Sequence, residues 1–370
     1  MKLITKFSFL TLTALACSIA YAAPRYTAID LGIPNDYVTS TNSVGTAVGV
    51  DFSLGMSARQ AFYYDGTSHR IGTLGGTNSS GTAINRNGHI VGGSDLLGDA
   101  NTHAFYFDGS MHDLGTLGGK NSGASGINSS NQIVGNSSLA GSDSSHAFLY
   151  DGHMHDLGTL GGSNSWAKAI SDNGIIIGGS HTTDNKEQHG FMYYDGVMHD
   201  LGKNHPYAIS SNGLIAGVSE LGNLTTHAFL FDGTIQDLGV LGNGRHSSAI
   251  AVNNNGWVIG DSNTEPDSGY YYPFLHDGSK MYDLNTLLTG TASTPSINRV
   301  LNINDEGTIF AMGHDDHLYA LNLVPQVPLP ASAWLFGSSF AGLIGLRRKL
   351  KTSYLLAAKK GGKIQTSHSF

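Results

Sequence analysis

A unit of about 43 residues recurs along the chain, and this repeat constrains the fold more than any other feature of the sequence. One copy, residues 146–180, reads HAFLYDGHMHDLGTLGGSNSWAKAISDNGIIIGGS. Its Asp-Gly pair recurs at spacings of 43, 43, 44, 37 and 45 residues, at Asp65, Asp108, Asp151, Asp195, Asp232 and Asp277. A repeat of this length is typical of a four-stranded propeller blade.

Each unit contains two predicted β-hairpins. HAFLY and GHMHDLG are joined by Asp-Gly, and WAKAIS and GIIIGGS are joined by Asp172-Asn173-Gly174. Both turn sequences tolerate the positive φ that a tight hairpin turn requires. We therefore predict four strands per unit: strand A at SxAxxIN, strand B at GxIVGxS, strand C at HAFLYD and strand D at xMHDLG.

The two ends of the repeat region complement each other. The A–B hairpin and the strand C motif each occur seven times. Residues 26–32 carry a strand D without its partner, and residues 317–323 carry a strand C without its partner. Pairing them closes a ring and leaves no open edge there. We predict an all-β, seven-bladed β-propeller closed by its terminal strands. A linear β-solenoid is the alternative, although it gives complementary ends no purpose.

Composition and charge agree with an exported β protein. The chain has 50 glycines, 13% charged residues and 9% aromatic residues, which is typical of a turn-rich fold. Its single cysteine, Cys17, precedes the repeats. Between the terminal segments, 11 lysines and arginines face 28 aspartates and glutamates, a net charge of −17. Such a surface repels phosphates, so nucleic acid is not an expected partner.

Residues 1–22 are predicted to be a secretory signal peptide. Lys2 and Lys6 precede an apolar core, and Ala20-Tyr21-Ala22 is a small-x-small cleavage site for signal peptidase. Cleavage after Ala22 leaves residues 23–324 as the predicted propeller domain. A lipoprotein anchored through Cys17 is the alternative, but Ala14 stands where a lipobox normally has leucine.

Candidate ligand-binding residues lie in the longer connections. The B–C and D–A connections share one face of the ring, and we expect binding there. The D–A motif Leu-Gly-Gly-x-Asn-Ser, at residues 74–79, 117–122 and 160–165, serves either as a structural turn or as a set of donors to a glycan. Departures from the repeat, or loop positions with aromatic and acidic groups, give these candidates: Trp166, His205, Arg245, His246, Glu265, Asp267 and Tyr271.

The sequence shows no catalytic or metal-binding signature. GxSxG, Walker and HExxH motifs are absent, and no paired-carboxylate pattern is evident. Most histidines occupy repeat positions, which places them around the ring and favours structural hydrogen bonds. The cluster from His314 to His317 lacks further ligands, so we expect neither a metal nor another cofactor.

The repeat resembles the bacterial extracellular repeats of the HAF family. HAFLYDG, MHDLGTLGG and AISDNGIIIGGS carry this resemblance, which extends over residues 26–324. It implies an exported bacterial repeat protein and supplies no activity or catalytic residue. The fourth unit departs most, because Leu-Gly-Lys-Asn-His-Pro replaces the full D–A connection. We therefore expect the binding face to be asymmetric around Lys203 to Pro206.

The C-terminal segment, residues 325–349, resembles a PEP-CTERM sorting signal. It contains Val-Pro-Leu-Pro with Pro328 and Pro330, a 16-residue apolar stretch expected to form a hydrophobic helix, and the basic residues Arg347 and Arg348. The resemblance implies an exosortase-type sorting protease as partner, a transient stay at the inner membrane, and release to the cell surface or matrix. Leu329 in place of glutamate and the basic tail at residues 350–370 depart from the pattern. A plain membrane anchor is the alternative.

These features predict an exported surface or matrix protein that acts as a binding or scaffold module. The PEP-CTERM resemblance makes exopolysaccharide the expected ligand. The alternative is a propeller-fold polysaccharide hydrolase or lyase, which needs carboxylates or a Tyr/His/Arg set converging at one mouth of the ring. Because no catalytic signature is present, a binding module is the favoured prediction.

Overall fold

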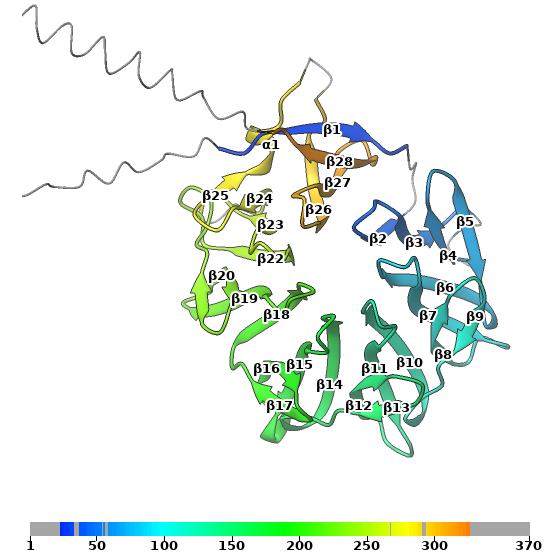
Figure 1. Cartoon of the computed structure of the whole chain (residues 1–370). Helices are drawn as coiled ribbons and strands as arrows, with labels where there is room; N and C mark the ends of the chain where they lie inside the picture. The colour runs from blue at the N-terminus through cyan, green and yellow to red at the C-terminus, as the bar shows by residue number, and fades with distance from the viewer. Residues whose placement is uncertain are drawn as a thin grey trace, which may run out of the picture. The chain divides into compact units, whose positions relative to one another are not determined.

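Seven four-stranded antiparallel sheets surround a common axis in the computed structural model of this chain (Figure 1). The structure describes residues 23–32, 37–53, 55, 58–266, 268–290 and 294–325. Residues 1–324 form one compact unit and residues 325–370 another, of which only Pro325 is described. The predicted seven-bladed β-propeller is confirmed.

Blades I to III follow one another in the chain, and each runs from an inner strand A to an outer strand D. Blade I comprises β2 (Tyr37–Thr41), β3 (Ala47–Asp51), β4 (Gln60–Tyr64) and β5 (Ser68–Gly72). Blade II comprises β6 (Gly75–Ile84), β7 (Ile90–Leu96), β8 (Thr102–Phe107) and β9 (Met111–Asp113). Blade III comprises β10 (Gly118–Ile127), β11 (Ile133–Leu139), β12 (Ser145–Tyr150) and β13 (Met154–Asp156).

Blades IV to VI keep this order, and blade VII combines both ends of the repeat region. Blade IV comprises β14 (Gly161–Ile170), β15 (Ile176–Thr182), β16 (Gln188–Tyr194) and β17 (Val197–Asp200). Blade V comprises β18 (Asn204–Ile209), β19 (Ile215–Gly222), β20 (Thr225–Phe231) and β21 (Ile235–Asp237). Blade VI comprises β22 (Ser247–Val252), β23 (Val258–Ser262), β24 (Tyr272–His276) and β25 (Met281–Asp283). Blade VII comprises β26 (Ile297–Ile303), β27 (Ile309–Gly313), β28 (Leu318–Leu323) and β1 (Tyr26–Asp30).

The ring closes where β1 pairs with β28. The register runs antiparallel from Tyr26 opposite Leu323 to Asp30 opposite Tyr319, so β1 is the outer strand of blade VII (Figure 1). Tyr26 is fully buried. Closure occurs as the complementary ends predict, and the solenoid alternative is wrong.

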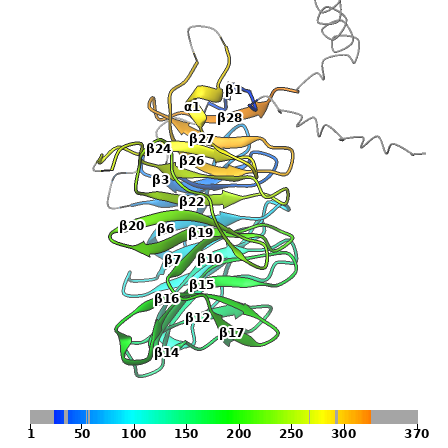
Figure 2. The ribbon, with the colours of Figure 1, turned by 90° about the vertical axis from the view of Figure 1, so that its left-hand side faces the viewer.

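The core lies between successive blades, which stack face to face in the side view (Figure 2). The phenylalanine of strand C is fully buried in blades I to VI, as Phe148 shows by packing against Val91 and Ile133. Strand B carries a recurring glycine because a Cβ at Gly135 would lie 2.0 Å from the carbonyl oxygen of Gly123. Within a blade, the strand B glycine therefore lets neighbouring backbones approach closely, while a large aromatic side chain on strand C fills the space between blades.

The element boundaries differ from the prediction in two places. The Gly-Gly-x-Asn-Ser segments expected as loops are the first halves of β6, β10 and β14, which are ten residues long. Two short helices also occur among the residues that the structure describes, α1 (Leu284–Leu287) and the 3-10 helix η1 (Thr183–Asn185). Asp283 starts α1 because its carboxylate accepts a hydrogen bond from Asn285 N.

Some predicted features lie outside the described residues. These are the signal peptide with Ala22, the sorting signal with Pro328, Pro330, Arg347 and Arg348, the C-terminal hydrophobic helix, and Asp267. Within the described ranges, none of the helices has the length and apolar character needed to cross a membrane.

Candidate functional site

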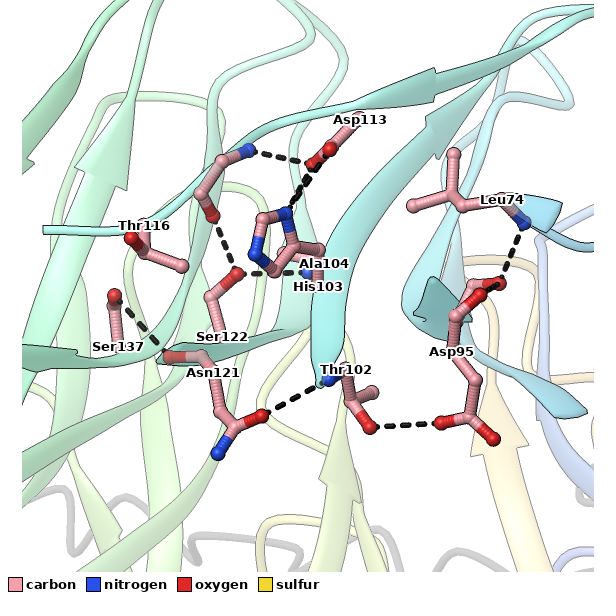
Figure 3. Close-up of polar contacts among 12 residues, drawn as sticks. Leu74, Asp95, Thr102, His103, Ala104, Asp113, Thr116, Asn121, Ser122 and Ser137 are labelled. Atoms are coloured by element: carbon pink, nitrogen blue, oxygen red, sulfur yellow. Dashed lines mark hydrogen bonds and ion pairs between the residues drawn. The ribbon is translucent and has the colours of Figure 1, made fainter. Parts of the chain in front are cut away.

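The Asn-Ser pair of the D–A motif joins neighbouring blades. Ser122 at the start of blade III accepts a hydrogen bond from Ala104 N of blade II at 2.8 Å and donates one to Gly115 O at 2.5 Å (Figure 3). Asn121 Oδ1 accepts from Thr102 N at 2.9 Å. Ser79, Ser165 and Ser247 bridge three other blade junctions in the same way. These contacts support the structural explanation of the motif.

The repeated histidines also have structural partners. His103 Nδ1 lies 2.8 Å from Asp113 Oδ1, which also accepts a hydrogen bond from Gly115 N (Figure 3). The same pairing joins the strand C histidine to the strand D aspartate in blades III, IV, V and VII. Among the residues that the structure describes, no group of three or more histidine, cysteine or acidic side chains could hold a metal ion.

The junction between blades IV and V departs from this pattern. The connection from Asp200 to Ile209 spans 10 residues, whereas Asp156 to Ile170 spans 15. Gly190 replaces the alanine of HAF, and its N–H donates to Gly202 O in place of a serine hydroxyl. A Cβ at Gly190 would lie 1.9 Å from Asn204 O. Glycine at this position therefore lets the shortened connection pass close to strand C.

The shortened connection leaves a groove on the B–C/D–A face. β18 has six residues and lacks the Gly-Gly segment that pairs with the end of strand B in blades II, III and IV. The groove has a volume of about 820 Å³ and spans blades IV, V and VI. Its lining includes His181, Glu187, Lys203, His205, Tyr207 and Glu220. The asymmetry expected near Lys203 therefore takes the form of a cavity.

Two carboxylates of the groove each lie beside a basic side chain. Lys203 Nζ lies 3.2 Å from Glu187 Oε1, and His205 Nε2 lies 3.1 Å from Glu220 Oε1. The hydrogen bond from Lys203 holds the pKa of Glu187 below its usual range. The Asp200 carboxylate raises the pKa of His189, which also lies 3.4 Å from Glu187 Oε2. The groove presents many donors and acceptors with little net charge, a surface that matches hydroxyl-rich ligands.

The structure gathers three of the predicted ligand-binding residues near this groove. His205 lines it. Trp166 packs edge-on against His181 with ring centroids 6.0 Å apart, and His246 forms a 3.0 Å hydrogen bond with Thr226 of the lining. The indole of Trp166 fits there because residue 179 is glycine, since a Cβ at that position would lie 2.4 Å from the ring.

The other described candidates are not part of the groove lining. Arg245 is exposed, and its carbonyl accepts a hydrogen bond from Thr226 N. Glu265 and Tyr271 belong to the B–C connection of blade VI, where Tyr271 is 54% exposed. The sequence reasoning missed Glu187, Tyr207 and Glu220. The 37-residue spacing of this unit was the available signal, because it marks where a connection is missing.

Comparisons with known proteins place the chain by fold and by one family match. The family described as "Protein of unknown function (DUF3466)" matches residues 158–317, a span that contains the groove lining of blades IV to VI. No curated protein sequence matches the chain. The HAF and PEP-CTERM resemblances therefore stay predictions.

Two solved structures share the propeller fold. The β-propeller domain of the Trilobed protease from Pyrococcus furiosus, described as having an open velcro topology, has a TM-score of 0.51 and 9% identity, over 80% of this chain and 99% of that chain. The acylaminoacyl peptidase of Pyrococcus horikoshii has a TM-score of 0.50 and 13% identity, over 80% of this chain and 53% of that chain. This chain thus spans about half of the peptidase. At these identities the likeness concerns the fold alone: the chain is a β-propeller that matches in part a family of unknown function.

Proposed function

We propose that this protein is an exported cell-surface or matrix module that binds polysaccharide in the groove across blades IV, V and VI. The observation that carries the proposal is the shortened D–A connection, which turns one of seven similar junctions into a cavity lined by paired charges and Tyr207. Its volume falls within the usual range for ligand sites, about 300–1,000 Å³. The sequence signals for export support the location.

The groove chemistry suits a sugar chain. Lys203, His205 and Glu220 point donors and acceptors into one cavity, where charged groups form stronger hydrogen bonds than neutral ones. Tyr207 offers an aromatic face together with a hydroxyl, and it is 43% exposed. Because Glu187 and Glu220 each already have a partner within the groove, the groove can contact hydroxyl groups without requiring a charged ligand.

A glycan array with the purified full-length chain tests this proposal. We expect saturable binding to at least one polysaccharide, reduced about tenfold or more in Glu220→Gln, which replaces the carboxylate beside His205 with a neutral amide. Glu306→Gln makes the same charge change at an exposed A–B turn on the opposite face and should bind normally. Absence of glycan binding, or equal binding by both variants, would contradict the proposal.

A lyase or hydrolase acting at the same groove is the second candidate. It is favoured by the convergence of Tyr207, His205 and Glu220, because a tyrosine or histidine can transfer the proton in sugar-chain cleavage. The polysaccharide bound in the array should then be incubated with the protein and its chain length followed by mass spectrometry. Shortened products that Tyr207→Phe no longer forms would establish the enzyme. Unchanged chain length would leave a binding module.

A further inference from the structure

All seven inner strands carry an irregularity at the same position. At this position the pairing of strand A with strand B shifts by one residue in every blade, so that one residue there is left out of the ladder. These seven residues line a central channel of about 630 Å³. β-bulges of this kind redirect a side chain and are common beside functional sites.

The seven bulge residues divide the channel into two different halves. In blades I to III they are Thr39, Thr82 and Ser125, whose hydroxyls donate to backbone carbonyls of the next blade at 2.7–2.8 Å. In blades IV to VII they are Lys168, Tyr207, Ile250 and Leu301. The bulge residues of blades I to III therefore form hydrogen bonds between blades, whereas those of blades IV to VII place longer side chains in the channel.

The groove and the channel meet in the second half. Tyr207 and Ser248 line both cavities. Asp261 on β23 lines the channel directly opposite Ser248 in the strand register. A chain-like ligand seated in the groove therefore has a path along Tyr207 to the Asp261 carboxyl.

In the folded protein, few favourable contacts offset the loss of hydration of the Asp261 carboxyl. Among the described residues its carboxyl has no hydrogen-bond donor and no ion pair. The nearby Arg299 guanidinium donates to Val38 O at 2.9 Å and packs on the Tyr37 ring. Burial raises the pKa of Asp261 to about 6, although Arg299 acts in the opposite direction. A partly buried carboxylate without a protein donor loses part of its hydration, and a ligand that brings a donor offsets that loss.

Long-range electrostatics favours a cationic donor over a neutral one. The repeat region carries a net charge of −17, which attracts cationic chains and raises their rate of association. An ammonium group satisfies a carboxylate with a charge-assisted hydrogen bond, about twice as strong as a neutral one. A sugar hydroxyl can also donate to the carboxylate, but it brings no positive charge to offset the negative charge of the carboxylate.

We propose that the channel end of the groove binds an amino-sugar polymer, with a free amino group seated on Asp261 between Tyr207 and Ser248. The inference rests on the proposed polysaccharide binding and names its ligand class. Lys168 lines the same channel and opposes the ammonium, so the two charged residues affect binding in opposite directions.

Titration calorimetry at neutral pH with the tetramers of glucosamine and N-acetylglucosamine tests the proposal on the full-length chain. We expect the glucosamine tetramer to bind about tenfold more tightly, a difference of about 1.4 kcal/mol. Asp261→Asn should abolish that preference, and Lys168→Met should increase it. Asp143→Asn removes an exposed charge from the B–C connection of blade III and controls for general attraction to an acidic protein.

The outcomes separate this inference from the proposed function. Equal binding of both tetramers, or a preference that Asp261→Asn retains, would overturn the amino-sugar assignment while leaving polysaccharide binding in place. Binding of neither tetramer would also overturn it. Loss of all polysaccharide binding on the array would overturn the proposed function itself. Thermal melts of each variant confirm that it is folded.

Discussion

At the residue scale, the pKa of Asp261 depends on where this residue lies in the ring. The equivalent strand B positions hold Val50, Gly93, Asn136, Gly179, Val218 and Met312, so only blade VI carries a charge there. Its raised pKa means that the folded protein binds the proton more tightly than the unfolded chain does. The ionised carboxylate therefore destabilises the fold above about pH 6, and this cost disappears as the pH falls towards 4.

We expect Asp261→Asn to stabilise the protein at pH 8 by about 2 kcal/mol and to have little effect near pH 4, because the amide removes only the cost of ionisation. Urea unfolding of both proteins at each pH measures the difference, in which the other titrating groups cancel. A variant that is less stable than the wild type at pH 8 would show that the carboxylate stabilises the fold.

The repeat predicted structural partners for the histidines but could not reveal Asp261 as a candidate. The pairing of His103 with Asp113 follows from neighbouring strands C and D in one unit, so local sequence contains it. The environment of Asp261 depends on blades V, VI and VII together, through Tyr207, Ser248 and Arg299. A charged residue at a strand position that is otherwise uncharged or apolar was the one available signal.

At the element scale, the shortened connection after Asp200 requires a glycine at position 190, because the connection passes close to that residue. Alanine occupies the equivalent position in blades I, II, III and V, so Gly190→Ala restores the repeat consensus. The added Cβ would nevertheless lie 1.9 Å from Asn204 O and 2.5 Å from Pro206 Cδ. We expect a loss of about 2–3 kcal/mol, as for other overpacked sites, measured by chemical denaturation.

Gly123→Ala is the matched control for that substitution. Gly123 also lies in a strand, its φ is not positive, and a Cβ there would meet nothing within 4 Å. It should change stability by less than about 1 kcal/mol. If Gly190→Ala proved equally harmless, the close approach of the blade V connection to strand C would be wrong.

Hairpins and strand types were predictable because each is encoded within about 20 residues by turn chemistry and alternation. The bulge in strand A was not, because its residues, such as Ser125 and Tyr207, share no type. The groove was predicted only as asymmetry near Lys203. Its lining comes from three blades, and local sequence does not reveal which side chains from different blades meet.

At the scale of the whole molecule, the ring depends on one short strand that is remote in sequence from its partner. β1 contributes five backbone positions to blade VII and buries Tyr26 completely. Asp30 Oδ2 lies 2.8 Å from His317 Nδ1, which repeats the strand C to strand D pairing across the closure. The closure could be predicted from the sequence because each end carries half of a repeat.

A circular permutant tests this architecture directly. Val324 N donates to Arg25 O at 2.7 Å, so a short glycine linker can join these ends as an ordinary C–D hairpin. We expect a chain that begins at Tyr37 and ends at Gly32 to melt within a few degrees of residues 23–324. Residues 37–324 alone, which lack β1, should melt about 10 °C or more lower, because the β28 edge and the Tyr26 site are then exposed. Equal instability of the permutant and the truncated chain would mean that the closing strand must enter from the N-terminus. A stable permutant would show that blade VII is an ordinary four-stranded blade whose outer strand is supplied by the other end of the chain.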